Sequence, residues 1–402
     1  MSRTAYWCLA VVLGLGLNGC QTRKPGTYRI VVIPKGLTHE HWQSVYRGAL
    51  RAADDLGKQG VPTEIIWDGP LRERDALAQI RIIDRRVSTR VDGIVLAPQH
   101  SQTMVAPVKR AGAEGIPVVV IDSGLESPDL FVKYVATDNF HGGYLAAQQL
   151  IRVLRAEGRT HPKLILLRYA VGSESTEKRE AGFEKYIDEE VQAGRLQVTW
   201  LSRDKYAGAT KDSALKEAAP LVNRFRDQID GIFTPNESSA SGMLDALRSL
   251  GLSQRVRRNG EPTDALRQAV QAGLVGAEIL TDGAAEATPP LLRDETRLKS
   301  LGLTKAVHLM GFDSSAPLLN AVADGEVDGL ILQDPYLMGY LSVWVLVRHL
   351  QGDDVSSGGK ELGTGEHVIT RANLDLPTTI ELFNPEAQSK RTIAVPIFPK
   401  RP

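Results

Sequence analysis

Short apolar runs rich in β-branched residues alternate along the chain with longer segments whose apolar positions recur at helical spacing. These runs predict strands at 28–33, 63–67, 93–97, 118–121, 164–167, 198–201, 231–234, 307–310 and 329–332. Strands that alternate with helices on this scale form βαβ units and parallel sheets. The pattern therefore predicts an α/β protein.

The first helical segment shows its period clearly, with an apolar stripe that runs from Trp42 to Leu56 and Gly57 placed to end it. The regular spacing of strands breaks after residue 234, because the next apolar run begins only at Val307. We expect an insertion at about 253–303 that lies on the surface rather than in the core and contains short helices near 264–272 and 291–301.

The first twenty residues differ in kind from the rest of the chain. Arg3 supplies a positive charge, an apolar run covers 5–17, and the run closes with Asn18, Gly19 and Cys20. We interpret this segment as a cleaved export signal, because its apolar run is shorter than the roughly 20 residues needed to span a bilayer. Permanent insertion as a membrane helix is the alternative.

The end of this signal resembles the lipobox of bacterial lipoproteins, in which the cysteine is lipidated and becomes the new N-terminus. That resemblance makes Cys20 a lipid anchor and 21–27 a tether, and it implies an exported, membrane-anchored protein of the periplasm or cell surface. Asn18 departs from the usual small residue, so ordinary cleavage or a buried cysteine stays open. Cys8 lies within the signal, so no disulfide is expected in the mature domain.

Composition sets broad limits on function. The chain has 402 residues, of which 42% are hydrophobic, so it has room for about two domains. Its 48 basic residues balance 48 acidic ones. This balanced charge lacks the surplus of basic residues that is typical of nucleic-acid-binding proteins, and a neutral small ligand fits it better.

Polar residues follow several predicted strands directly. In open parallel sheets, ligands bind in the crevice beyond these carboxyl ends of the strands. The groups that follow five of these strands are 34–42, 122–123, 235–237, 311–313 and 333–335.

Each of these polar or aromatic residues also has an explanation that requires no ligand. Asp122, Asn236 and Asp313 could each cap a following helix. Aromatic residues such as Trp42 are more often packed in a core than used as ligand platforms. Two histidines around Glu40 lack an evident third metal ligand, so no metal site is expected.

The chain resembles the periplasmic sugar-binding family typified by ribose-binding protein, whose fold is shared by the ligand domains of lac-repressor-type regulators. The resemblance covers roughly residues 28–375. Its segments are IVVI at 30–33, HEHW at 39–42, DGIVLAP at 92–98, GIPVVVID at 115–122, ATDN at 136–139 followed by the glycines at 142–143, STEKREAGF at 175–183, DGIFTPN at 230–236, GFD at 311–313 and DG at 324–325.

This resemblance implies two Rossmann-like lobes with parallel sheets, joined by a three-segment hinge, as in type I periplasmic binding proteins. The chain is expected to cross between lobes near Thr137, near Gln333 and at 369–373. The N-terminal lobe would hold 28–136 and 334–368, the C-terminal lobe 137–333 and 369–390, and a tail 391–402.

The resemblance also implies that the ligand lies between the lobes. Carried over position by position, the ligand contacts fall on His39, His41, Trp42, Asp122, Arg179, Asn236, Asp313 and Gln333, with Tyr206 as an approximate further aromatic. Carboxylates, amides and a guanidinium can each pair with neighbouring sugar hydroxyls, and a flat aromatic ring can cover the C–H face of a sugar.

The resemblance implies a monomeric solute-binding protein that delivers a monosaccharide or a derivative to an ABC-type importer, without catalysis, metal or cofactor. The alternative is a receptor for a sugar or an autoinducer that presents its closed form to a membrane sensor. Lys35, His39, His41 and Ser123 depart from the family pattern and leave the identity of the ligand open. Lys35, His39 and Arg179 together could favour an acidic or phosphorylated sugar. A regulator is excluded because the export signal stands where a DNA-binding helix-turn-helix would be.

No enzyme signature accompanies these residues. The sequence contains no glycine-rich phosphate loop, no CxxC or HExxH motif, and no convincing set of nucleophile and base.

Overall fold

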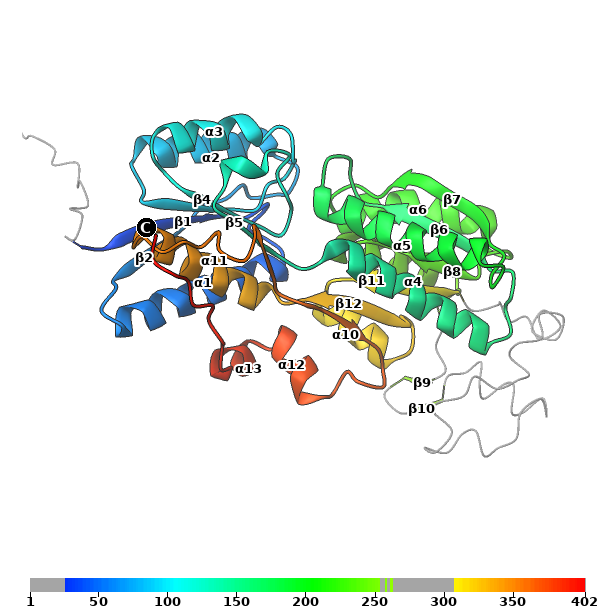
Figure 1. Ribbon diagram of the computed structural model, residues 1–402. Helices are drawn as coiled ribbons and strands as arrows, with labels where there is room; N and C mark the ends of the chain where they lie inside the picture. The colour runs from blue at the N-terminus through cyan, green and yellow to red at the C-terminus, as the bar shows by residue number, and fades with distance from the viewer. Residues whose placement is uncertain (1–25, 254–256, 259–260, 263–306, 402) are drawn as a thin grey trace, which may run out of the picture.

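The computed structural model describes residues 26–253, 257–258, 261–262 and 307–401. Two six-stranded sheets, each sandwiched between helices, form two lobes that lie side by side (Figure 1). The strand orders are β13-β5-β4-β3-β1-β2 and β14-β12-β11-β8-β6-β7. The predicted two-lobed α/β fold is confirmed.

The N-terminal lobe is built on a parallel sheet. Its strands are β1 (Tyr28–Ile33), β2 (Thr63–Trp67), β3 (Gly93–Leu96), β4 (Val118–Ile121), β5 (Lys133–Ala136) and β13 (Glu361–Gly363). Its helices are α1 (Glu40–Lys58), α2 (Ala76–Ser88), α3 (Val105–Ala113) and α11 (Pro335–Leu350), with a short 3₁₀ turn η1 (Pro128–Leu130). Alternate residues of β1 face two different cores, since Val32 packs on the α1 and α11 side and Val31 on the α2 and α3 side.

The C-terminal lobe repeats this plan. Its strands are β6 (Lys163–Arg168), β7 (Thr199–Tyr206), β8 (Gly231–Phe233), β11 (His308–Phe312) and β12 (Gly329–Gln333), which are parallel, and β14 (Glu366–Ile369), which is antiparallel to β12. Its helices are α4 (Asn139–Ala156), α5 (Glu174–Gln192), α6 (Lys211–Phe225), α7 (Glu237–Ser249) and α10 (Ala316–Ala323).

Three expected features fall wholly or largely outside the described residues. They are the export signal with Cys20, most of the tether, and most of the insertion at 253–303. Within that last range the structure describes a short antiparallel ladder of β9 (Arg257–Arg258) and β10 (Glu261–Pro262). No helix in the described part of the chain is both long and apolar enough to cross a membrane.

The first helix ends later than its sequence predicts. Gly57 lies inside α1, and the left-handed residue beyond the helix is Gly60, with φ +78°. Gly60 N–H donates to Gly57 O at 3.0 Å and Val61 N–H to Leu56 O at 3.0 Å. These two bonds form a Schellman motif, which satisfies carbonyl groups at the end of the helix.

The chain crosses between the lobes at Thr137, at Asp334 and at Thr364. The first and third crossings lie together, because Thr137 Oγ1 donates to Gly365 O at 3.1 Å. The expected third crossing at 369–373 is wrong, since β14 already pairs with β12 of the C-terminal lobe from residue 366. The polar segments of β13 and β14 carry no apolar run that could have shown this.

The C-terminal segment adds a fourth connection. Leu382 of α12 (Pro377–Phe383) packs in the C-terminal lobe, whereas Gln388 of α13 (Pro385–Lys390) bonds to α1 of the N-terminal lobe. The last residues, including Phe398, pack against the core of the N-terminal lobe. Residues 385–390 therefore lie on the N-terminal lobe, not on the C-terminal lobe as expected (Figure 1).

Candidate functional site

A cavity of about 770 Å³ lies between the lobes at the carboxyl ends of their strands. Its lining residues are Lys35, Thr38, His39, Glu40, His41, Trp42, Glu73, Asp122, Tyr169, Ser173, Ser175, Thr176, Arg179, Asn236, Glu237, Asp313, Ser314, Ser315 and Gln333.

Two aspartates occupy equivalent places in the two lobes. Asp122 follows β4 and Asp313 follows β11, and each of these strands is the third in the order given above for its sheet. Both have left-handed backbones, with φ +62° and +65°, a conformation that is uncommon for non-glycine residues and frequent at functional sites. Neither caps a helix, so the capping explanation does not apply to them.

Lys35 neutralises Asp122 at the N-terminal side of the cavity. Lys35 Nζ lies 2.5 Å from Asp122 Oδ2 and donates to Ser123 Oγ at 2.6 Å. Burial on its own would raise the pKa of Asp122, but Lys35, His41 and Arg179 outweigh it and leave that pKa lowered. Asp122 is therefore an ionised acceptor.

Arg179 of α5 neutralises Asp313 in the C-terminal lobe, as Lys35 neutralises Asp122 in the N-terminal lobe. Its side chain is 2% exposed, lies over the Phe312 ring at 3.8 Å from the ring centroid, and contacts Asp313 Oδ2 through Nη1 at 3.2 Å. Nε donates to Asn139 Oδ1 at 2.8 Å and Nη1 to Pro235 O at 2.9 Å. The guanidinium is thus held rigidly at the cavity wall.

Buried polar atoms around the cavity, among them His41 Nε2, Ser173 Oγ, Arg179 Nη2 and Gln333 Oε1, have no hydrogen-bond partner within the described chain. Burial lowers the pKa of His41 even though Asp313 and Asp122 oppose the change, so its imidazole is neutral at pH 7. Buried polar groups are nearly always paired, so a cluster of unpaired ones indicates a place for a polar ligand.

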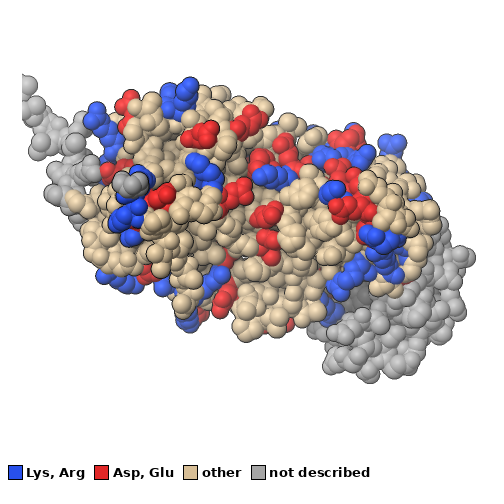
Figure 2. All heavy atoms as spheres, viewed as in Figure 1, with Lys and Arg blue, Asp and Glu red and all other residues tan. Residues whose placement is uncertain are grey.

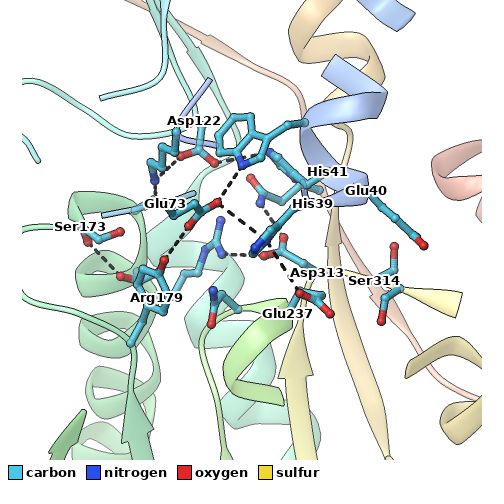
Figure 3. Close-up of a pocket in the computed structure, with 18 of the residues that line it drawn as sticks. His39, Glu40, His41, Glu73, Asp122, Ser173, Arg179, Glu237, Asp313 and Ser314 are labelled. Carbon is cyan, nitrogen blue, oxygen red and sulfur yellow. Dashed lines mark hydrogen bonds and ion pairs between the residues drawn. The ribbon is translucent and has the colours of Figure 1, made fainter. Parts of the chain in front are cut away.

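Glu73 joins the two lobes across the cavity. Its Oε1 accepts from Trp42 Nε1 at 2.7 Å within the N-terminal lobe, and its Oε2 accepts from the Tyr169 hydroxyl of the C-terminal lobe at 2.5 Å. His39 Nδ1 lies 3.8 Å from carboxylate oxygens of both Glu73 and Glu237 (Figure 3). Burial raises the pKa of Glu237, which His39 partly opposes.

All but one of the predicted ligand contacts line this cavity. Asn236 does so while its side chain also caps α7, as the capping explanation predicts. Trp42, 2% exposed, belongs both to the core and to the cavity wall. Tyr206 is absent from the wall, because it ends the edge strand β7 with its residue 44% exposed.

Sequence reasoning missed Glu73 and Tyr169. Glu73 lies in a loop six residues beyond the end of β2, so it does not follow its strand directly and nothing local marks it. Tyr169 follows β6 directly, and the strand-end rule applied to that strand would have found it. Among the described residues, no group of three or more His, Cys, Asp or Glu is placed to hold a metal ion.

A family model described as the periplasmic binding protein domain matches residues 30–288 and 296–354. The D-ribose/D-allose-binding protein of Pseudomonas aeruginosa is 25% identical over 248 residues, 60% of this chain and 73% of that protein. The ribose import binding protein of Bacillus subtilis is 28% identical over 179 residues, 44% of this chain and 54% of that protein.

Solved structures agree with these matches. A carbohydrate transporter solute-binding protein of Agrobacterium radiobacter, in complex with D-arabinose, superposes with a TM-score of 0.68 at 25% identity over 90% of this chain and 100% of that one. A solute-binding protein of an ABC transporter from Agrobacterium vitis, with bound D-fucose, gives 0.65 at 27% identity over 88% and 99%.

Proposed function

Because this chain belongs to the periplasmic binding protein family, we propose that it captures a neutral monosaccharide or a derivative between its lobes and delivers it to an ABC-type importer. The family consists of exported substrate-binding proteins that do not transform their ligands. The observation that carries the proposal is the convergence of polar groups from both lobes on one cavity, several of them buried without a hydrogen-bond partner among the described residues.

The charges around the cavity favour a neutral ligand over an acidic or phosphorylated one. The wall holds five carboxylates, those of Glu40, Glu73, Asp122, Glu237 and Asp313, against two permanent cations. Each cation already contacts an aspartate. A ligand anion would therefore meet surplus negative charge in a partly desolvated site, which is unfavourable.

The remaining expectations belong to the same proposal. Delivery to an importer is preferred to presentation of the closed form to a membrane sensor, because the relatives include import and transport proteins. Lipidation of Cys20 would anchor the protein to a membrane, and its support is the lipobox-like end of the signal. A single chain supplies both walls of the cavity, in keeping with a monomer.

Isothermal titration calorimetry tests the proposal with a panel of neutral pentoses and hexoses, uronic acids and sugar phosphates. We expect micromolar or tighter binding of a neutral sugar and binding of the related acid weaker by at least about tenfold. Asp122→Asn and Asp313→Asn should each weaken binding by about 10- to 150-fold, because a hydrogen bond to a charged group contributes about 1.5–3 kcal/mol.

Asp204→Asn is the matched control. Asp204 is an exposed aspartate of β7 outside the cavity wall, so this change should leave affinity as it is. Absence of binding across the whole panel at millimolar concentration, or wild-type affinity in both cavity variants, contradicts the proposal.

A further inference from the structure

A second cavity, of about 830 Å³, lies beside the first. Its walls come from α1, from the crossing at 332–335, and from α12 and α13 of the C-terminal segment. The segment that connects the lobes for a fourth time therefore encloses this space on one side. No ligand contact expected from the sequence is specific to it.

The two cavities meet at a partition made of side chains. Glu40, His41, Asp313, Ser314 and Gln333 line both. In Figure 3, Glu40 and Ser314 lie beyond His41 and Asp313 as seen from Ser173. Side chains can change rotamer where a backbone wall could not, so a ligand in the first cavity could extend past them.

Two buried atoms of the partition, His41 Nε2 and Gln333 Oε1, have no hydrogen-bond partner among the described residues. His41 Nε2 lies 3.6 Å from Asp122 Oδ1, and Gln333 donates through Nε2 to Asp313 Oδ1 at 2.6 Å. One atom belongs to the N-terminal lobe and the other to the strand end at the second crossing. A polar group that passes between the cavities would contact both of them.

The second cavity has the mixed surface that a sugar ring needs. Leu382, Phe383 and Pro385 supply an apolar wall, while Arg47 and Gln388 supply polar atoms. Arg47 Nη2 donates to Gln388 Oε1 at 3.2 Å, and Arg47 Nε is buried with no hydrogen-bond partner in the part of the chain that the structure describes. Apolar surfaces cover the C–H face of a sugar, and the guanidinium can donate to its hydroxyls.

We propose that the two cavities form one extended site for a two-part ligand, a sugar in the first cavity that carries a second sugar ring in the second. The inference rests on the proposed function, since the first ring occupies the site described above. The preferred ligand is then a disaccharide, and a free monosaccharide fills only half of the site.

Calorimetry on the full mature chain compares matched pairs: D-xylose with xylobiose, D-galactose with lactose, and D-glucose with cellobiose. We expect at least one disaccharide to bind about tenfold or more tightly than its own monosaccharide. Arg47→Met should remove that advantage while leaving the affinity for the monosaccharide unchanged, because Arg47 does not line the first cavity.

Arg51→Met is the control, because Arg51 lies one turn further along α1 and also contacts α13 but does not line the second cavity. Monosaccharide binding with every disaccharide weaker overturns the inference and leaves the proposed function standing. So does a disaccharide advantage that survives Arg47→Met. If neither these six sugars nor any sugar of the panel described above binds, the proposed function fails and the extended site fails with it.

Discussion

Individual buried charges in this protein perform two separate tasks. Asp122 and Asp313 face the cavity in strained backbone conformations, each neutralised by one cation. His308 instead lies inside the C-terminal lobe, with Nε2 3.0 Å from Glu157 Oε2 and Nδ1 2.8 Å from Asp328 Oδ1. The first arrangement presents acceptors to a ligand, and the second ties secondary-structure elements together.

The His308 cluster should make stability depend on pH. Burial lowers the pKa of His308, but Asp328 and Glu157 outweigh it and raise that pKa to about 9. The stabilisation that protonated His308 contributes is therefore complete below the pKa of histidine in the unfolded chain, about 6.5, and it is lost as the pH rises through 9. Urea unfolding should show a decline of up to about 3 kcal/mol between pH 6 and pH 10 that His308→Gln lacks. Parallel pH profiles for the two proteins would contradict this assignment.

At the scale of elements, each lobe contains a pair of helices in contact through glycines. A Cβ on Gly48 of α1 would lie 2.0 Å from Tyr336 O of α11, and one on Gly143 of α4 would lie 1.8 Å from Arg179 O of α5. No side chain fits at such a distance. These glycines set the separation of the helices, and Gly143 thereby also sets the position of Arg179 at the cavity.

Gly143→Ala should therefore reduce both stability and ligand affinity. Overpacking of this kind costs about 1–3 kcal/mol, and displacement of α5 moves the Arg179 guanidinium away from its partners. Gly112→Ala is the matched control, because Gly112 lies in α3 with nothing near its Cβ position. The control should gain about 0.5–1 kcal/mol, as alanine does in a helix. Thermal unfolding and calorimetry measure both effects, and equal behaviour of the two variants would refute the packing argument.

At the scale of the whole molecule, the lobes are in contact across the cavity. Besides the Tyr169 to Glu73 bond, Gly124 N–H donates to Glu174 Oε2 at 2.8 Å and Ser101 N–H to Gly172 O at 3.2 Å. These bonds exist only when the lobes are together. Basic and acidic residues are interspersed over the face shown in Figure 2, so no field of one sign opposes closure there.

Tyr169→Phe should shift the free protein toward an open form. The change removes one bond between the lobes to a charged acceptor and keeps the ring. Small-angle scattering without ligand should give a larger radius of gyration for Tyr169→Phe than for wild type. Tyr144→Phe removes a similar bond, to Glu189 at 2.8 Å, within a single lobe, and should leave the radius unchanged. Equal radii for all three proteins would show that this bond does not control closure.

The apolar pattern alone was enough to place nine strands and the fold class, because strand formation and the alternation of strands with helices depend on local periodicity. Of the strands in the two six-stranded sheets it missed β5, β13 and β14, and it also missed the short pair β9 and β10. β13 and β14 are short and contain at most two consecutive apolar residues, and they are strands only because a neighbouring edge strand offers free hydrogen-bonding groups. For the same reason the third crossing was expected too late in the chain.

The sequence by itself also determined which strand ends line the cavity, since the βα order brings Asp122, Asn236 and Asp313 to the carboxyl edges of their sheets. Only the tertiary structure decided that Glu73 meets Tyr169, that Tyr206 lies apart, and that α13 reaches α1 to enclose a second cavity. These contacts join segments far apart in the chain, and their formation depends on the packing of whole lobes rather than on any local pattern.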